Sequence, residues 1–255
     1  MNYNRDVEIF PVVKRILEKI TKSESMYQSP TDMGVNRAGF GITDDAIVQE
    51  AAKQEVIRRY FRYKCEHVMG FVDAGTVERA ELIMKELDLK PEDRRVVVHA
   101  RQAASDCKQK QKGNEGIYSG AALELADGTI VMGKNSSVMH AASSLILNAI
   151  KQLASIPDAI HLLSPNVTES IARFKENILG ARSISLDLGE TLIALSISAT
   201  TNPSAEAAMN RLKELRGCNV HTTHIPTPGD EAGMRKLGLN LTSDPDFSTK
   251  SLYVD

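Results

Sequence analysis

The sequence predicts an α/β protein (α+β overall) in which a helical region, residues 1–112, precedes a three-layer α/β/α sandwich with a mixed sheet, residues 113–255. Two patterns predict this architecture. Before residue 112 apolar residues recur at helical spacing, and after it short apolar runs alternate with helical segments. The polar, basic stretch "CKQKQKGNEG" between the two regions has the composition of a linker.

The helical region begins with a segment at 6–20 whose apolar residues fall on one stripe, as in an amphipathic helix. A second helix is predicted from the cap residues Thr43-Asp44 to Gly70, with good helix formers between them. Two further helices are expected within 73–109. Pro91 separates them, because proline interrupts helical hydrogen bonding.

The second region begins with a predicted hairpin. Two short apolar runs, 117–125 and 129–135, flank Asp127-Gly128, and Asp-Gly is typical of a tight hairpin turn. A helix is then expected from about Ser137 to Leu153, followed by a buried strand at 159–164.

The remaining elements continue the alternation. Ser164-Pro165 opens a helix, and the segment 190–215 predicts two helices because Asn202-Pro203 suits a helix start better than a helix interior. A strand at 219–226, a short helix at 229–238 and a last strand at 239–245 complete the predicted sandwich.

Composition excludes several classes of protein. The net charge of −2 does not favour binding to nucleic acid or to an anionic membrane, and no apolar run approaches the roughly 20 residues of a membrane span. Three widely spaced cysteines form neither a zinc ribbon nor a disulfide framework. The first residues carry charges where a secretory signal has its apolar core, so a cytoplasmic protein is expected.

The passage after the hairpin resembles the outline of a zinc-dependent nucleobase deaminase. Such an enzyme presents His-Ala-Glu on the first helix and Pro-Cys-x-x-Cys at the start of a later one. Here a Gly133-x-Asn135 corner precedes a helix that carries His140-Ala141, and Pro203 opens a later helix. The resemblance implies a deaminase-like scaffold.

The deaminase chemistry is absent from these positions. Ala142 stands where the proton-transferring glutamate would be, and Ser204 and Ala207 stand where the thiolates would be. Neither residue binds zinc as a thiolate does. We therefore expect no metal, no cofactor and no turnover of cytidine or adenosine, with His140 as a partly buried helix histidine.

Several longer blocks, among them "NYNRDVEIFPV", "SPTDMGVNRAGFGITDD", "LELADGTIVMGK" and "RKLGLNLTSDP", follow one another in the order seen in one bacterial family. The whole chain is similar to domain-of-unknown-function family 1846. Members of that family are about twice as long, and their front half carries a Gly-rich loop that resembles a phosphate-binding loop. No GxxxxGK[ST] occurs here. The resemblance therefore implies the C-terminal half of a family member.

Two kinds of segment are candidate binding sites. The polar loop at 29–41 lies between helices, and two later helix starts present small polar side chains where free N–H groups favour an anion. The candidate ligand-binding residues are Asp32, Asn36, Asn135, Ser136, Ser137, Thr200, Thr201, Asn202 and Ser204. The alternative is that these residues only form turns and cap helices.

Two functions from different classes fit these features. One is the C-terminal half of a larger nucleotide- or anion-related enzyme, with no independent catalysis and an unknown catalytic residue. The other is a non-catalytic ligand-binding or oligomerisation module. The expected partners are a small anionic ligand and either further copies of the chain or the missing N-terminal half, because a half-length chain exposes apolar surface.

Overall fold

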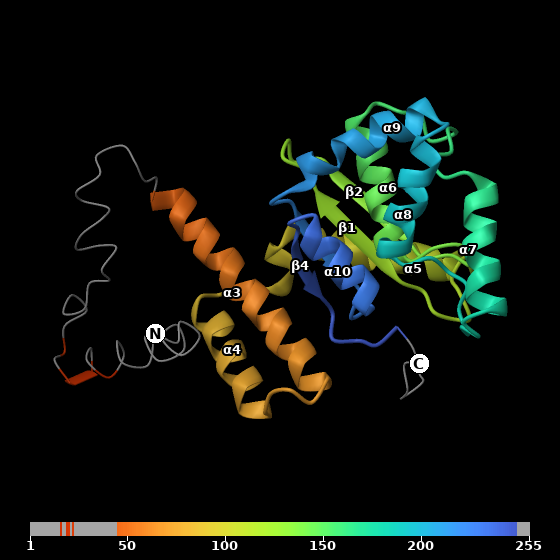
Figure 1. The fold of residues 1–255 in the computed structure, drawn as a ribbon. Coiled ribbons are helices and arrows are strands. Elements are labelled where there is room, and N and C mark those ends of the chain that lie inside the picture. Colours follow the sequence, from red (N-terminus) through yellow and green to blue (C-terminus); the bar gives the residue numbers. More distant parts are fainter. Residues whose placement is uncertain (1–15, 17–18, 21, 23–44, 249–255) are drawn as a thin grey trace. The chain divides into compact units, whose positions relative to one another are not determined.

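The computed structural model describes residues 16, 19–20, 22 and 45–248 (Figure 1). The loop at 29–41, with the candidates Asp32 and Asn36, lies outside the described residues, as does most of the helix expected at 6–20. Contacts divide the chain into two compact units, Met1–Asp93 and Arg94–Asp255.

The first unit contains the helix pair predicted from the sequence. Helices α3 (Asp45–Val68) and α4 (Ala74–Glu86) pack against each other, and a short 3-10 turn, η2 (Pro91–Asp93), follows. The turn between them uses Gly70 at a φ of +80°, which favours glycine. Asp73 then caps α4 by accepting a hydrogen bond from Thr76 N at 2.7 Å.

The second unit contains a mixed sheet, as the sequence predicts. Its described strands are β1 (Gly120–Glu124), β2 (Ile130–Lys134), β3 (Asn219–Thr222) and β4 (Asn240–Ser243), in the order β2-β1-β3-β4. Strand β1 pairs antiparallel with β2 and with β3, whereas β3 and β4 are parallel. The predicted hairpin at Asp127-Gly128 is confirmed.

Helices lie on both faces of this sheet. A Cβ placed on Gly120 would lie 2.3 Å from Ala100 O of α5 (Arg95–Gln109), and one on Gly133 would lie 2.3 Å from Leu145 N of α6 (Ala141–Leu153). Gly133 pairs with Ala121, the neighbour of Gly120, so the two glycines face opposite sides. Helix α5 precedes the boundary expected at residue 112, but it belongs to the second compact unit, because the two units divide between Asp93 and Arg94.

The other helices of the unit begin where the sequence predicts. They are α7 (Pro165–Asn177), α8 (Leu188–Ala199), α9 (Pro203–Asn210) with the 3-10 turn η3 (Arg211–Leu215), and α10 (Pro228–Lys236). Proline occupies the first turn of three of them, where its missing N–H costs nothing. The large core cluster joins α6, α8, α9 and α10 to the sheet (Figure 1).

Two sequence predictions are wrong in detail. The run at 159–164 is a loop, not a strand. A short apolar run also fits a loop whose side chains are buried, and here Leu162 is buried in the core cluster without strand pairing. The helix expected from Ser137 begins at Ala141. The preceding residues are extended instead, since Met139 bridges Leu186 in parallel and His140 N donates to Leu186 O at 2.9 Å. In the described part of the chain, no helix is long and apolar enough to cross a membrane.

Candidate functional site

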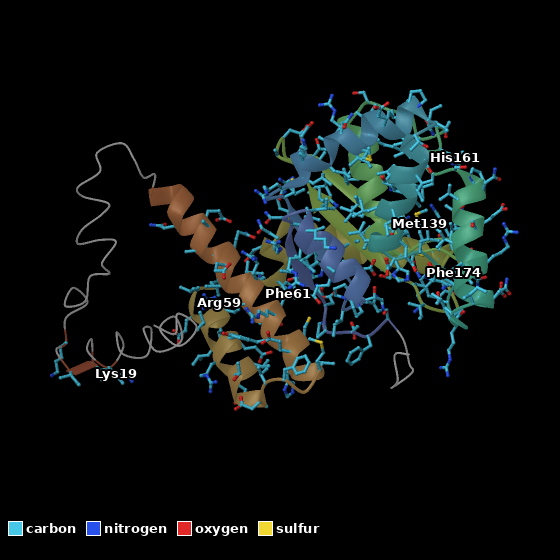
Figure 2. The ribbon with its side chains drawn as sticks, viewed as in Figure 1. Lys19, Arg59, Phe61, Met139, His161 and Phe174 are labelled. Carbon is cyan, nitrogen blue, oxygen red and sulfur yellow. The ribbon has the colours of Figure 1, made fainter. Side chains whose placement is uncertain are left out.

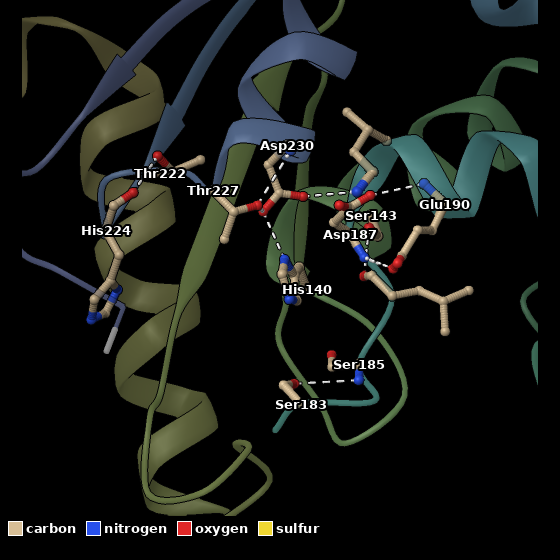
Figure 3. A network of polar contacts seen from close by, with 12 residues as sticks. His140, Ser143, Ser183, Ser185, Asp187, Glu190, Thr222, His224, Thr227 and Asp230 are labelled. Carbon is tan, nitrogen blue, oxygen red and sulfur yellow. Dashed lines mark hydrogen bonds and ion pairs between the residues drawn. The ribbon is translucent and has the colours of Figure 1, made fainter. Parts of the chain in front are cut away.

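One buried carboxylate joins the starts of three helices in the second unit (Figure 3). Asp230, in the first turn of α10, accepts hydrogen bonds from Thr227 Oγ1 at 2.8 Å and from Leu188 N, the first residue of α8, at 2.8 Å. It also contacts His140 Nδ1, at the start of α6, at 2.7 Å. Its side chain is 6% exposed, so every bond is made in a partly dehydrated setting.

The contact with Asp230 determines which nitrogen of His140 is available. A carboxylate only accepts hydrogen bonds, so Nδ1 of His140 carries the hydrogen and Nε2 is the atom that gains or loses a proton. Nε2 has no hydrogen-bond partner among the described residues, and the side chain is 28% exposed. Burial disfavours the cation, but the hydrogen bond and the charge of Asp230 outweigh burial and raise the pKa of His140.

A second set of charged groups, Asp187, Glu190 and Lys175, lies near this pair and carries a net charge of −1. Asp187 Oδ1 accepts from Glu190 N at 2.8 Å and Glu190 Oε2 accepts from Asp187 N at 3.0 Å, which forms a capping box on α8. Lys175 Nζ lies 2.8 Å from Glu190 Oε2. A Cβ on Gly229 would lie 2.0 Å from Asp187 Oδ2, so glycine is required for the carboxylate to approach α10 this closely.

This arrangement can perform two kinds of chemistry. As an imidazolium, His140 donates Nε2–H to an anion, and as a neutral ring it accepts a proton there. Helix α6 adds N–H groups, because no side chain caps its start. Among the described residues, no group of three or more His, Cys, Asp or Glu side chains could hold a metal ion.

The first predicted helix start leads into this site. Asn135 is 8% exposed, and its carboxamide bonds main-chain atoms, Ser119 N at 2.8 Å and Ile117 O at 3.0 Å. Ser136 Oγ accepts from Val138 N at 3.2 Å, so it forms a turn ahead of His140. Ser137 is exposed.

The second predicted start lies elsewhere. Thr200, Thr201, Asn202 and Ser204 follow the C-terminal end of α8, whereas the Asp230 cluster is at its N-terminal end. Twelve helical residues at 1.5 Å each separate the two places by ~18 Å. The structure therefore does not bring the two starts together. Asn202 caps α9 by accepting from Ser204 N at 3.0 Å.

Three acidic residues of the site, Asp187, Glu190 and Asp230, were not anticipated from the sequence, although two local patterns contain them. "TPGD" at 227–230 is a cap residue, a first-turn proline and an acidic third position, and "DLGE" at 187–190 is a capping box. The proline-opened helix that meets His140 is thus α10 at Pro228, not α9 at Pro203. At the two cysteine positions of Pro-Cys-x-x-Cys it carries Gly229 and Ala232, so no thiolate is present.

The fold and the site define a mixed α/β protein with an aspartate–histidine pair where three helices begin. A family model described as "Domain of unknown function DUF1846, C-terminal" matches residues 92–253, and one described as "Domain of unknown function DUF1846, N-terminal" matches residues 1–88. The chain belongs to the DUF1846 family. The expectation that it holds only the C-terminal part is wrong, because the N-terminal model also matches.

Curated relatives agree with this assignment. The chain is similar to a UPF0371 protein of Clostridium botulinum (strain 657 / Type Ba4), with 52% identity over 255 residues, which are 100% of this chain and 51% of the relative. It is also similar to a UPF0371 protein of Clostridium tetani (strain Massachusetts / E88), with 51% identity over the same shares of both chains. The chain thus spans about half the length of the curated relatives it matches.

Proposed function

We propose that the α/β unit binds a small anionic ligand through Nε2 of His140. The observation that carries this proposal is the 2.7 Å contact between His140 Nδ1 and the buried Asp230 carboxylate at the meeting of three helix starts. That contact fixes the ring, favours its cationic form and leaves Nε2 as the donor. A charged donor in a partly dehydrated site makes a stronger hydrogen bond than a neutral one.

The charge of Asp187 opposes such a ligand, whereas the other two acidic groups are hydrogen-bonded or paired with a cation. The Asp230 carboxylate is occupied by three hydrogen bonds, and Glu190 is paired with Lys175. The starts of α6, α8 and α10 each contribute positive partial charge, and only α6 lacks a side-chain cap. The anion would therefore lie between Nε2 of His140 and the first turn of α6.

The scaffold, we further propose, is deaminase-like but works without zinc. In a zinc deaminase the metal lies between the helix that follows the hairpin and a later proline-opened helix. The His140–Asp230 hydrogen bond, which joins the start of α6 to the start of the proline-opened α10, supports this proposal. Gly229 and Ala232 remove the thiolates, so the histidine is available to a ligand instead.

Thermal shift with inorganic phosphate and with sulfate, at pH 6 and at pH 8.5, tests the proposal. Both anions should raise the melting temperature more at the lower pH, and His140→Gln should remove the shift. His99→Gln, in α5, is the matched control and should keep it. No shift in the parent protein, or an equal shift in His140→Gln, would contradict the proposal.

Ser204→Glu locates the anion independently. A ligand at His140 should still bind this variant, because the start of α9 lies at the far end of α8. If Ser204→Glu abolishes the shift and His140→Gln does not, the ligand binds at residues 200–204 and the assignment to His140 fails.

A second candidate function, self-association, is favoured by exposed apolar side chains on α7 and α8. No residue of α7 is fully buried, and Phe174 and Ile178, the residue that follows α7, are 52% and 71% exposed. On the neighbouring α8, Ile193 and Ile197 are 61% and 49% exposed. The occupant proposed for this face is a second copy of the chain, because exposed apolar stripes on surface helices mark association sites.

Sedimentation velocity at micromolar concentration tests this second candidate. The parent protein should form dimers or larger species, and Ile193→Glu should convert them to monomers. Ser105→Glu, on an exposed position of α5, is the control for added charge. A parent protein that sediments as a monomer would exclude the association.

A further inference from the structure

A cavity of about 400 Å³ lies between the outer edge of β2, one face of α6 and the loop at 161–163. Its volume falls within the ~300–1,000 Å³ that small-molecule sites occupy. Figure 2 labels two of the lining residues, Met139 and His161. The residues that bind Asp230 do not line it.

The floor of the cavity is one stripe of α6. Ser144, Leu147, Asn148 and Lys151 line it, and their spacing of three, four and seven residues places them on the same helix face. Leu162 and Leu163 add apolar surface from the loop. Leu162 is 3% exposed and belongs to the main core cluster, so the apolar run that the sequence assigns to a strand serves the core, and the half-buried Leu163 faces the cavity.

The outer edge of β2 directs main-chain groups, among them the N–H groups of Met132 and Lys134, away from β1. Asn148 Nδ2 donates to Met132 O at 2.9 Å, so the main chain of Met132 faces away from β1. Antiparallel pairing alternates along a strand, and the main chain of Lys134 therefore faces the same way. A further strand added to β2 would need the Met132 carbonyl that Asn148 already occupies. The edge suits a compact ligand better than an extended peptide.

The charges around the cavity favour an anion. Two lysines and a histidine, but no carboxylate, are among the ten lining residues, all of them within the described part of the chain. Lys134 Nζ lies 3.2 Å from Asp106 Oδ2, which balances its charge. Lys151 Nζ instead donates to a neutral group, the carbonyl of Asp158, at 2.9 Å. Lys151 is therefore the cation that a ligand can neutralise.

From the apolar wall, the main-chain donors and this lysine, we infer that the cavity binds a small amphipathic anion. The ligand class is an aliphatic carboxylate: its chain lies on Met132, Met139 and Leu163, and its carboxylate accepts from Lys151. This site is separate from His140 and does not depend on the function proposed there.

Octanoate is the probe, with acetate and octanamide as partial analogues, and binding is measured by titration calorimetry. Octanoate should bind, acetate should not because it lacks the chain, and octanamide should bind about tenfold more weakly because a neutral amide replaces the charge-assisted bond. Lys151→Gln should reduce octanoate affinity by the same factor. Lys236→Gln, an exposed lysine at the end of α10, should leave it unchanged.

A second variant locates the ligand without weakening the core. Ser144→Leu fills the cavity from the half-buried face of α6 and should abolish octanoate binding while the protein stays folded. His140→Gln should bind octanoate normally. The inference is overturned if octanoate does not bind at millimolar concentration, if octanamide binds equally well, or if Ser144→Leu or Lys151→Gln binds as the parent does.

Discussion

Replacing Asp230 by asparagine tests the central contact of the candidate site. The asparagine would keep the shape of the side chain and an oxygen for Leu188 N, but it would remove the negative charge that faces His140 Nδ1 at 2.7 Å. Hydrogen bonds to charged groups contribute ~1.5–3 kcal/mol. We therefore expect Asp230→Asn to lower the free energy of unfolding by about 2 kcal/mol at pH 6, which lowers Tm by roughly 4–8 °C for a domain of this size.

The pH dependence of that loss has a definite sign. In the parent protein the pKa of His140 is raised, so its protonation stabilises the fold below the ordinary pKa and this stability is lost as pH rises through the folded pKa. In Asp230→Asn burial, together with the charge of Lys175, outweighs the remaining charge of Asp187, so the pKa of His140 falls below its ordinary value. The difference in stability between the two proteins should therefore shrink between pH 6 and pH 8.5.

Urea denaturation followed by circular dichroism measures the stability, and NMR titration of the histidine ring protons measures the pKa of His140. Glu231→Gln, the exposed neighbour on α10, is the control and should change neither. The proposed role of Asp230 would be refuted by an unchanged pKa of His140 in the variant. A stability loss that does not vary with pH would also refute it.

Three other predictions follow from the structure. Burial raises the pKa of Asp244, but hydrogen bonds with His221 and Arg101 lower it to about 2. Arg101→Gln should therefore reduce the free energy of unfolding above pH 4. In the parent protein, acid titration should show the stabilisation by ionised Asp244 disappearing as pH falls towards 2. Gly133→Ala should destabilise by about 3 kcal/mol in urea denaturation, because its Cβ would lie 2.3 Å from Leu145 N, whereas Ala126→Gly on an exposed turn should have little effect. Elemental analysis of protein purified without chelator should find no stoichiometric zinc, and one zinc per chain would contradict the site described at His140.

Local chemistry determined most of the helix and turn positions. Proline at 165, 203 and 228 sets a backbone angle that suits a first helical turn, and the structure begins α7, α9 and α10 at these residues. Asp127-Gly128 forms the predicted hairpin because Gly128 takes a φ of +83°, which few other residues adopt. Such features depend on residues only a few positions apart, so the sequence contains all the information they need.

Other features of the fold depend on packing contacts between residues that are far apart in the sequence. The apolar run at 159–164 is compatible with a strand or a loop, and only its position beside α6 shows that Leu162 is buried without a strand partner. Helix α6 begins at Ala141 and not at the predicted Ser137, because the preceding residues hydrogen-bond to Leu186, which lies 46 residues after His140. Propensity rules do not include a partner so distant along the chain.

The candidate site shows the same division between local and tertiary information. The sequence by itself placed His140 in the first turns of a helix and determined that the glutamate and cysteines of a zinc deaminase are absent. Only the tertiary structure decided that Asp230, 90 residues away, contacts Nδ1 of His140, and that residues 200–204 lie at the other end of α8. The physical reason is that a cap or a turn is a property of neighbouring residues, whereas a shared carboxylate requires three helix starts to be packed against one sheet.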